Sequence, residues 1–350
     1  MLELIGNSLV FRFPEVHEDA VCTITFQRTL RIPDDNRTYG LPPGLGEFPL
    51  EHTSKHSANL PDSIASKGGV LLPMYQAEAL WISFSSSSGY PFAVKITAGK
   101  INAVTGEPWV QGIKNDPQDY VAVPSQPWLD GFCVGEGIVR QFVAMPLGQG
   151  YTAEEQITGK AENGGIQVAV APMKRSDYDQ FVSRTKQKTY SESIRLDCGD
   201  EAAYQEIWDS PSDQYTSAPV TSPMGLAPGG AMSQEIYQDV HSASQYDQVN
   251  FSRCFVNLLN SAGWTSVTGK PMPTKPVTAQ DYSAAGLPWF SYYDEKATAV
   301  PGSSTLGNLS SVAAKHISKE GKPLSGNAPV NPTHTIHIHK NPNQVKDGNW

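Results

Sequence analysis

Three runs of sequence decide the fold of this chain: ALWISF at 79–84, FAVKIT at 92–97 and GIVRQFVAM at 137–145. In the first run, Leu80, Ile82 and Phe84 alternate with other residues, as apolar residues do on one face of a strand. Turns rich in Gly, Pro and Ser separate the runs. Short alternating strands joined by such turns are typical of a β-sandwich or a barrel-like core. We therefore predict a mainly β fold.

The same pattern continues on both sides of these runs. Leu9, Phe11 and Phe13 alternate near the N-terminus, and IQVAV at 166–170 follows a tight Asn-Gly-Gly turn. The chain has 30 glycines and 27 prolines in 350 residues, about 16% of the sequence, whereas these two types make up roughly 12% of an average protein. Helix signals are short, and the clearest are a capping box at Thr152 and a helix start at Thr278.

Composition along the chain predicts four segments. A β-rich core spans residues 1–182, and a stretch rich in Ser, Pro and Gly at 183–235 is predicted to be a linker or a long surface excursion. A smaller α+β module follows at 236–295, and its apolar run 251–259 fits either a strand or a buried helix. Residues 296–350 form an extended C-terminal tail, whose composition alone is typical of disorder.

Charge and hydropathy argue against several kinds of partner. The chain has 26 Lys and Arg against 35 Asp and Glu, a net charge of −9, and no long basic run. Nucleic acids and anionic membranes bind concentrated positive charge, so neither is an expected partner. No apolar run approaches the roughly 20 residues of a transmembrane helix. The first residues also lack the features of a signal peptide. We therefore expect a cytoplasmic protein without membrane insertion.

The four cysteines lie far apart, at positions 22, 133, 198 and 254. None belongs to a CxxC or to another metal-binding spacing. Two disulfides are arithmetically possible, but buried free thiols are the favoured interpretation in a reducing compartment.

The most chemical feature is the run HTIHIH at 334–339. On a strand, His337 and His339 fall on one face. Two imidazoles one pleat apart suit zinc or a similar divalent ion, with His334 or His316 as a third ligand. The alternative is a polar strand face in a tail rich in Asn and His. A metal-binding protein or metal-dependent enzyme is therefore an alternative function.

Four aromatic residues are candidate contacts for a ligand or a partner chain: Trp109, Tyr120, Trp128 and Trp350. The first three flank turns, where an exposed ring can stack on a sugar or on a protein surface. Packing in the core or at the rim of a sandwich is the simpler interpretation. A carbohydrate-binding β-sandwich is a further alternative. It needs coplanar rings beside carboxylates, for which Asp119 and Asp130 are the local candidates.

Several stretches resemble a family of uncharacterised bacterial and some fungal proteins. The matching text is RIPDD (31–35) with LPPGLG (41–46), PMYQAEALW (73–81), QPWLDG (126–131), RQFVAMPLG (140–148) and GLPWF (286–290). The resemblance spans about residues 28–295 and implies that both modules belong to one unit. It implies no catalytic residue and no ligand.

The sequence contains no phosphate loop, nucleophile elbow or dinucleotide fingerprint, so no catalytic residue and no cofactor other than a metal ion is expected. The Pro- and Gly-rich stretch 39–49 carries apolar residues and predicts an ordered arm across a surface. Our leading hypothesis is a non-enzymatic structural or interaction protein. It assembles with copies of itself, as a homo-oligomer or polymer, through this arm and the tail.

Overall fold

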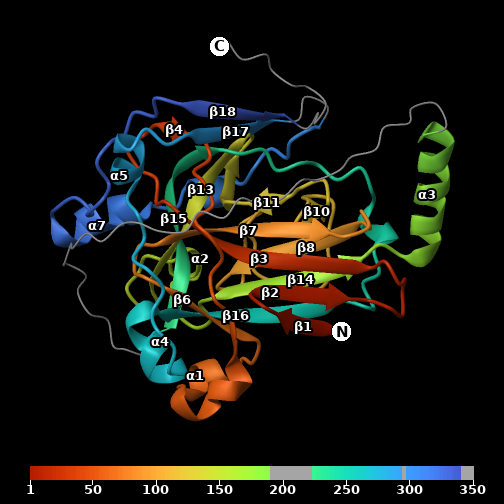
Figure 1. The fold of residues 1–350 in the computed structure, drawn as a ribbon, viewed down its shortest axis with the longest axis horizontal. Helices are drawn as coiled ribbons and strands as arrows, with labels where there is room; N and C mark the ends of the chain where they lie inside the picture. The colour runs from red at the N-terminus through yellow and green to blue at the C-terminus, as the bar shows by residue number, and fades with distance from the viewer. Residues whose placement is uncertain (190–222, 294–296, 340–350) are drawn as a thin grey trace.

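The computed structural model describes residues 1–189, 223–293 and 297–339 (Figure 1). Within these ranges, 16 strands form one large sheet and two further strands form a separate parallel ribbon. The longest helix is α3 (Arg175–Thr189), which stands at one side of the molecule in Figure 1. The fold is mainly β, as predicted.

The large sheet follows one path of antiparallel neighbours. In spatial order these are β1 (Leu2–Ile5), β2 (Ser8–Arg12), β3 (Val21–Thr29), β7 (Ala79–Ser86), β13 (Ile138–Pro146), β15 (Pro223–Ser233), β16 (Ser252–Asn260), β14 (Ile166–Pro172), β8 (Phe92–Ala98) and β10 (Val121–Val123). Shorter strands pair beside this path: β4 (Thr38–Tyr39), β5 (Glu51–His52), β6 (Val70–Met74), β9 (Ile101–Asn102), β11 (Trp128–Leu129) and β12 (Gly131–Gly135). Of these, β4 and β6 run parallel to their neighbours β15 and β16.

The remaining helices are short. They are η1 (Thr53–Asn59), α1 (Asp62–Ala65), α2 (Ala153–Thr158), η2 (Ala243–Gln245), α4 (Ser261–Thr268), α5 (Ala279–Ala284), α6 (Ser304–Gly307) and α7 (Val312–Glu320). The predicted capping box is confirmed at α2, where Thr152 and Glu155 bond each other's backbone N–H at 3.2 Å. Thr278 caps α5, also as predicted. No helix in the described ranges is long and apolar enough to cross a membrane.

The three runs that decide the fold are β7, β8 and the long strand β13. On β7, Leu80, Ile82 and Phe84 are buried, whereas Trp81 on the opposite face is half-buried. β8, which pairs with β14 and β10, is buried along its whole length. The alternating and continuous apolar patterns thus distinguish strands with one covered face from strands with two.

The sheet curls so that strands far apart along its path enclose one core. The ring of Phe13, just after β2, lies 6.1 Å from the ring of Phe92 on β8. Buried residues of β2, β3 and β7 belong to the same apolar cluster as those of β8, β14 and β16. Two halves of one sheet therefore face each other, and their burial of apolar area stabilises the fold.

The strand order joins the segments that we predicted as a core (1–182) and as a smaller module (236–295). Strand β16 pairs with β14, β15 and β6, in the interior of the large sheet. The second segment therefore completes the core instead of forming a unit of its own. The run 251–259, which periodicity left open, is this strand.

The prediction of a linker at 183–235 is wrong for residues 223–233, which form the interior strand β15. Close packing explains the glycines that favour a linker in the sequence. A Cβ added to Gly230 would lie 2.3 Å from the Pro33 carbonyl oxygen, and one added to Gly229 would lie 2.7 Å from Val143 Cγ2. Pro228 occurs beside a shift of register, where the ladder tolerates a missing N–H. Residues 190–222 lie outside the described ranges.

The arm and much of the tail are docked on their own chain. In the arm, Phe48 is fully buried. In the tail, Leu306 and Val312 are buried, and Ser303 N–H donates to the Cys133 carbonyl at 3.0 Å. A Cβ on Gly302 would lie 2.4 Å from the Cα of Gly135, so the two backbones touch. The segment that we predicted as an extended tail therefore packs on the body of the protein as far as the ribbon strand at 335–339.

Candidate functional site

The ribbon consists of β17 (Trp289–Tyr293) and β18 (Thr335–His339), which run parallel. Trp289 anchors β17, since its side chain is buried against the ring of Tyr39 at 5.7 Å. Phe290 exchanges two backbone hydrogen bonds of 2.7 and 2.9 Å with Leu41 of the arm. A Cβ on the preceding Gly40 would lie 2.8 Å from the Phe290 carbonyl oxygen, so this approach needs glycine. The inner edge of the ribbon is therefore fixed to the body.

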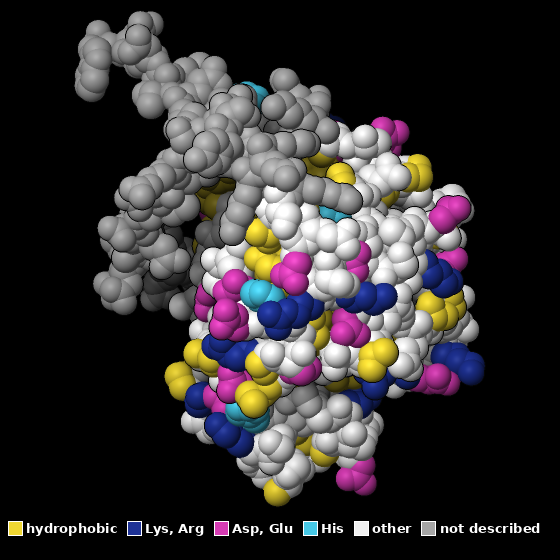
Figure 2. Space-filling view, turned by 90° about the vertical axis from the view of Figure 1, so that its right-hand side faces the viewer, with side chains coloured by type: hydrophobic (Ala, Val, Ile, Leu, Met, Phe, Trp, Pro, Cys, Tyr) yellow, Lys and Arg dark blue, Asp and Glu magenta, His cyan; other side chains and the backbone are white. Residues whose placement is uncertain are grey.

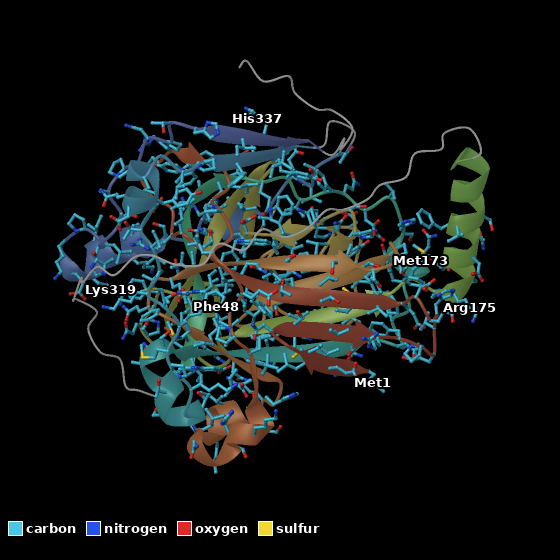
Figure 3. The ribbon with its side chains drawn as sticks, in the orientation of Figure 1. Met1, Phe48, Met173, Arg175, Lys319 and His337 are labelled. Carbon is cyan, nitrogen blue, oxygen red and sulfur yellow. The ribbon has the colours of Figure 1, made fainter. Side chains whose placement is uncertain are left out.

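The outer strand β18 is exposed at residues 335–338. Ile336 and Ile338 are 40% and 41% exposed, and His337 between them is exposed as well. In the described part of the chain, β18 pairs with β17 alone, so its other edge keeps unpaired backbone groups. Figure 3 shows His337 at the margin of the molecule, whereas Phe48 lies within the body. Residues 335–338 of β18 are therefore exposed, and no described strand pairs with the second edge of β18.

The predicted metal residues lie on or beside this strand. His334 and His337 are exposed, and the side chain of His339 lies outside the described part. His337 Nδ1 is 2.5 Å from Ser291 Oγ on β17. Among the described residues of the chain, three or more His, Cys, Asp or Glu do not come together as a metal site. The sequence thus located histidines on and beside β18, but the described residues of one chain do not form a complete ligand set.

Two of the candidate aromatic residues contact other residues of their own chain. Tyr120 is fully buried, and its hydroxyl donates to Asp239 Oδ2 at 2.8 Å. The prediction that Tyr120 contacts a ligand or partner at the surface is therefore wrong, because this tyrosine lies in the core. Trp109 is half-buried, with its ring 5.4 Å from Lys95 Nζ. Trp350 lies outside the described residues.

Trp128 belongs to an aromatic cluster beneath the ribbon. Its ring lies 6.4 Å from Trp81 and 4.8 Å from Tyr292 of β17, at interplanar angles of 66° and 60°. Rings that meet edge to face do not offer the coplanar platform on which a sugar stacks. The cavity beside Trp128 has a volume of about 10 Å³, which is room for one water at most. This geometry favours packing over carbohydrate binding.

Asp130, the carboxylate beside Trp128, is buried. Its Oδ2 accepts from Gln234 Nε2 at 2.7 Å, and its backbone N–H donates to Gln234 Oε1 at 2.9 Å. Burial raises the pKa of Asp130 to about 7, although hydrogen bonds from Trp128 and Gln234 act in the opposite direction. This carboxyl group therefore changes charge near neutral pH while holding the cluster that supports β17.

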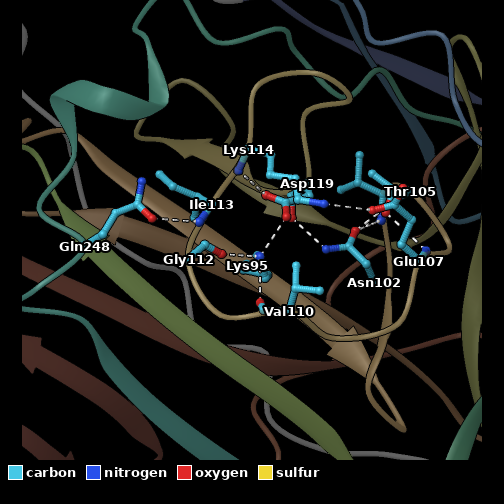
Figure 4. A network of polar contacts seen from close by, with 11 residues as sticks. Lys95, Asn102, Thr105, Glu107, Val110, Gly112, Ile113, Lys114, Asp119 and Gln248 are labelled. Carbon is cyan, nitrogen blue, oxygen red and sulfur yellow. Dashed lines mark hydrogen bonds and ion pairs between the residues drawn. The ribbon is translucent and has the colours of Figure 1, made fainter.

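Asp119, the other carboxylate considered for a sugar site, forms a buried ion pair with Lys95 of β8 (Figure 4). Both residues are at most 2% exposed, and Lys95 Nζ lies 2.7 Å from Asp119 Oδ2. The same ammonium donates to the carbonyls of Val110 and Gly112. Asp119 Oδ1 accepts the backbone N–H of Lys114 at 2.8 Å. All three ammonium protons have acceptors, so the pair holds a loop on β8 and is not a free nucleophile.

A groove of about 470 Å³ lies between the arm at 44–46 and the extended segment 274–277. The pair Arg28–Glu78 forms its floor, with Arg28 Nη2 2.8 Å from Glu78 Oε1. Arg28 Nη1 also donates to Thr274 Oγ1 at 2.8 Å. Burial raises the pKa of the Glu78 carboxyl, and the charge of Arg28 opposes that shift. Arg28 and Glu78 therefore bond to each other and to their own chain, and Lys275 also lines the groove.

The face shown in Figure 2 carries charges of both signs side by side. Lys and Arg side chains alternate with Asp and Glu and do not gather into a basic patch. This agrees with the net charge of −9 in giving no support to a nucleic-acid surface on this face. Three cysteines, Cys22, Cys133 and Cys254, are buried free thiols as predicted, and Cys198 lies outside the described residues.

No protein-family model, curated protein or solved structure matches this chain. Sequence reasoning located the histidines of β18. It missed that no described strand pairs with the outer edge of β18, because the parallel pairing of 289–293 with 335–339 joins residues far apart in the chain.

Proposed function

We propose that this chain is a non-enzymatic structural protein that assembles with a second copy of itself through β18. The observation that carries the proposal is the exposure of residues 335–338, together with an edge of β18 that no strand of the described residues pairs with. Natural edge strands are protected by charged side chains, proline or bulges. The sequence of β18, TIHIH, contains no such charge and no proline. An unprotected edge of this kind is suited to pairing with another strand.

Self-complementarity favours a second copy over an unrelated partner. The central residues Ile336, His337 and Ile338 read the same in both directions. In an antiparallel pair centred on His337, each Ile336 would lie opposite Ile338 of the other copy. Isoleucine would then meet isoleucine on one face and histidine would meet histidine on the other. A twofold axis makes this contact identical for both copies, as most homodimers require.

A cytoplasmic location is part of the proposal, and the three buried free thiols support it, since reducing compartments keep thiols unpaired. A carbohydrate-binding role is not proposed, because the rings around Trp128 are not coplanar.

The test is the molar mass of the full chain by size-exclusion chromatography with light scattering. The expected mass is twice the 38.0 kDa of one chain. Ile338→Lys puts a charge on the edge strand and should shift the protein to the monomer. Ile317→Lys is the matched control, because it removes an isoleucine that is 52% exposed on α7. It should leave the dimer intact.

Two results would count against the proposal. One is a monomer at every concentration of the unmodified chain. The other is an Ile338→Lys variant that keeps the mass of the parent. If Ile317→Lys alone gave a monomer, the interface would lie on α7 and the assignment to β18 would be wrong.

A further inference from the structure

We infer that a divalent metal ion, zinc by the chemistry of its ligands, bridges two copies of the chain through His337 of each copy. The inference rests on the proposed pairing of β18 and names what that pairing binds. A single chain does not bring together three suitable ligands among its described residues. A second copy paired through β18 would add the ligands that the described residues of one chain lack.

The hydrogen bond of His337 prepares the ring for a metal. Nδ1 lies 2.5 Å from Ser291 Oγ on the inner strand β17. The two nitrogens of an imidazole are on opposite edges of the ring. When Nδ1–H donates to Ser291, Nε2 keeps its lone pair, which is then available to a metal ion. Metal-binding histidines regularly hydrogen-bond their second nitrogen, which fixes both the tautomer and the ring orientation.

The geometry of an antiparallel pair brings the two rings within reach of one ion. Residues directly opposite each other have Cβ atoms about 4.5–5.5 Å apart. Two imidazoles can converge from that separation on an ion with Zn–N distances of about 2.0–2.1 Å. By strand alternation, position 339 falls on the same side as position 337. Two copies thus offer up to four histidine positions, and zinc prefers four ligands in a tetrahedron.

Isoleucine and histidine then have separate roles in the contact. Ile336 and Ile338 supply apolar contact on one face of the paired strands, independent of metal. The ion joins the imidazoles on the other face and should tighten a dimer that already exists. Zinc is favoured over calcium or magnesium because neutral imidazole suits zinc, whereas the latter two prefer oxygen ligands.

The test uses the full chain purified without an affinity tag and stripped with EDTA. Sedimentation velocity over a range of protein concentrations gives the dimer dissociation constant with and without zinc chloride. We expect zinc to lower this constant at least tenfold, with one zinc bound per dimer by elemental analysis. His337→Ala should keep the metal-free dimer and lose the response to zinc. His52→Ala, a change of the same type on β5, should respond as the parent does.

The outcomes separate this inference from the proposed function. A dimer that forms equally well with and without zinc overturns the inference and leaves the assembly through β18 standing. The inference is also wrong if His337→Ala responds to zinc as the parent does, or if zinc binds adventitiously without changing the dissociation constant. A monomer at all concentrations, with or without zinc, would overturn both.

Discussion

The buried carboxyl of Asp130 makes the fold less stable as pH rises. A carboxylate in an ion pair has the opposite effect, because its pKa is lowered. Its pKa is raised from 3.8 to about 7 in the folded chain. Between these values the unfolded chain loses the proton and the folded chain keeps it. The contribution of this carboxyl to the free energy of unfolding is therefore fully present below pH 3.8 and is lost as pH rises through about 7. The full loss is about 4 kcal/mol at about 1.4 kcal/mol per pH unit.

Asp130→Asn isolates this effect, since the amide is similar in shape and carries no charge. The free energy of unfolding is measured by urea denaturation of parent and variant at pH 5 and pH 8. Between pH 5 and pH 8, the free energy of unfolding of the variant should rise by about 2.5 kcal/mol relative to that of the parent. The sign follows because only the parent must ionise a buried carboxyl at the higher pH.

Asp62→Asn on the exposed surface of α1 is the control for the loss of one negative charge. A difference between Asp130→Asn and the parent that stays constant across this pH range would refute the reasoning. So would a difference that changes in the opposite direction, since that would mean that the buried carboxyl is stabilised as the anion.

Two further predictions concern packing and the ion pair in Figure 4. Lys95→Met leaves Asp119 buried without its cation and should lower the free energy of unfolding by about 3–5 kcal/mol. Adding Asp119→Asn should restore part of this loss, and a double variant no better than Lys95→Met would contradict a direct pairing. Gly230→Ala forces a Cβ to 2.3 Å from the Pro33 carbonyl and should cost about 1–3 kcal/mol in urea denaturation. Gly135→Ala on β12, where the nearest atom is 4.0 Å away, should cost less, and equal losses would show that close approach does not explain Gly230.

Local sequence patterns predicted those elements that depend on residues close to each other in the sequence. The alternation of β7 and the capping box at Thr152 both act within a few residues, and both are seen in the structure. The interior strand β15 escaped prediction because its glycines and prolines have the composition of a linker. Their role depends on Pro33 and Val143, which approach from distant parts of the chain. Contacts of that range leave no periodic signal in the sequence.

The candidate site shows the same limit. The spacing of His337 and His339 could be read from the sequence, because strand alternation is local. Whether their strand is buried or free depends on its neighbours in space. The partner β17 comes from residues 289–293, more than forty positions earlier, and the pairing that holds β17 comes from Leu41. The tail's composition suggested disorder, yet Leu306 and Val312 bury it against the body.

The way in which β17 is held also bears on whether assembly would end at two copies. A fibre needs a strand at each edge that can accept the next chain. Within the ribbon, Leu41 already bonds to Phe290 on the inner edge, whereas no described strand pairs with the outer edge of β18. Pairing two β18 strands uses the outer edge of both copies at once. The expected product of the proposed contact is a closed dimer with ribbons in the order β17, β18, β18 and β17, and not an open polymer.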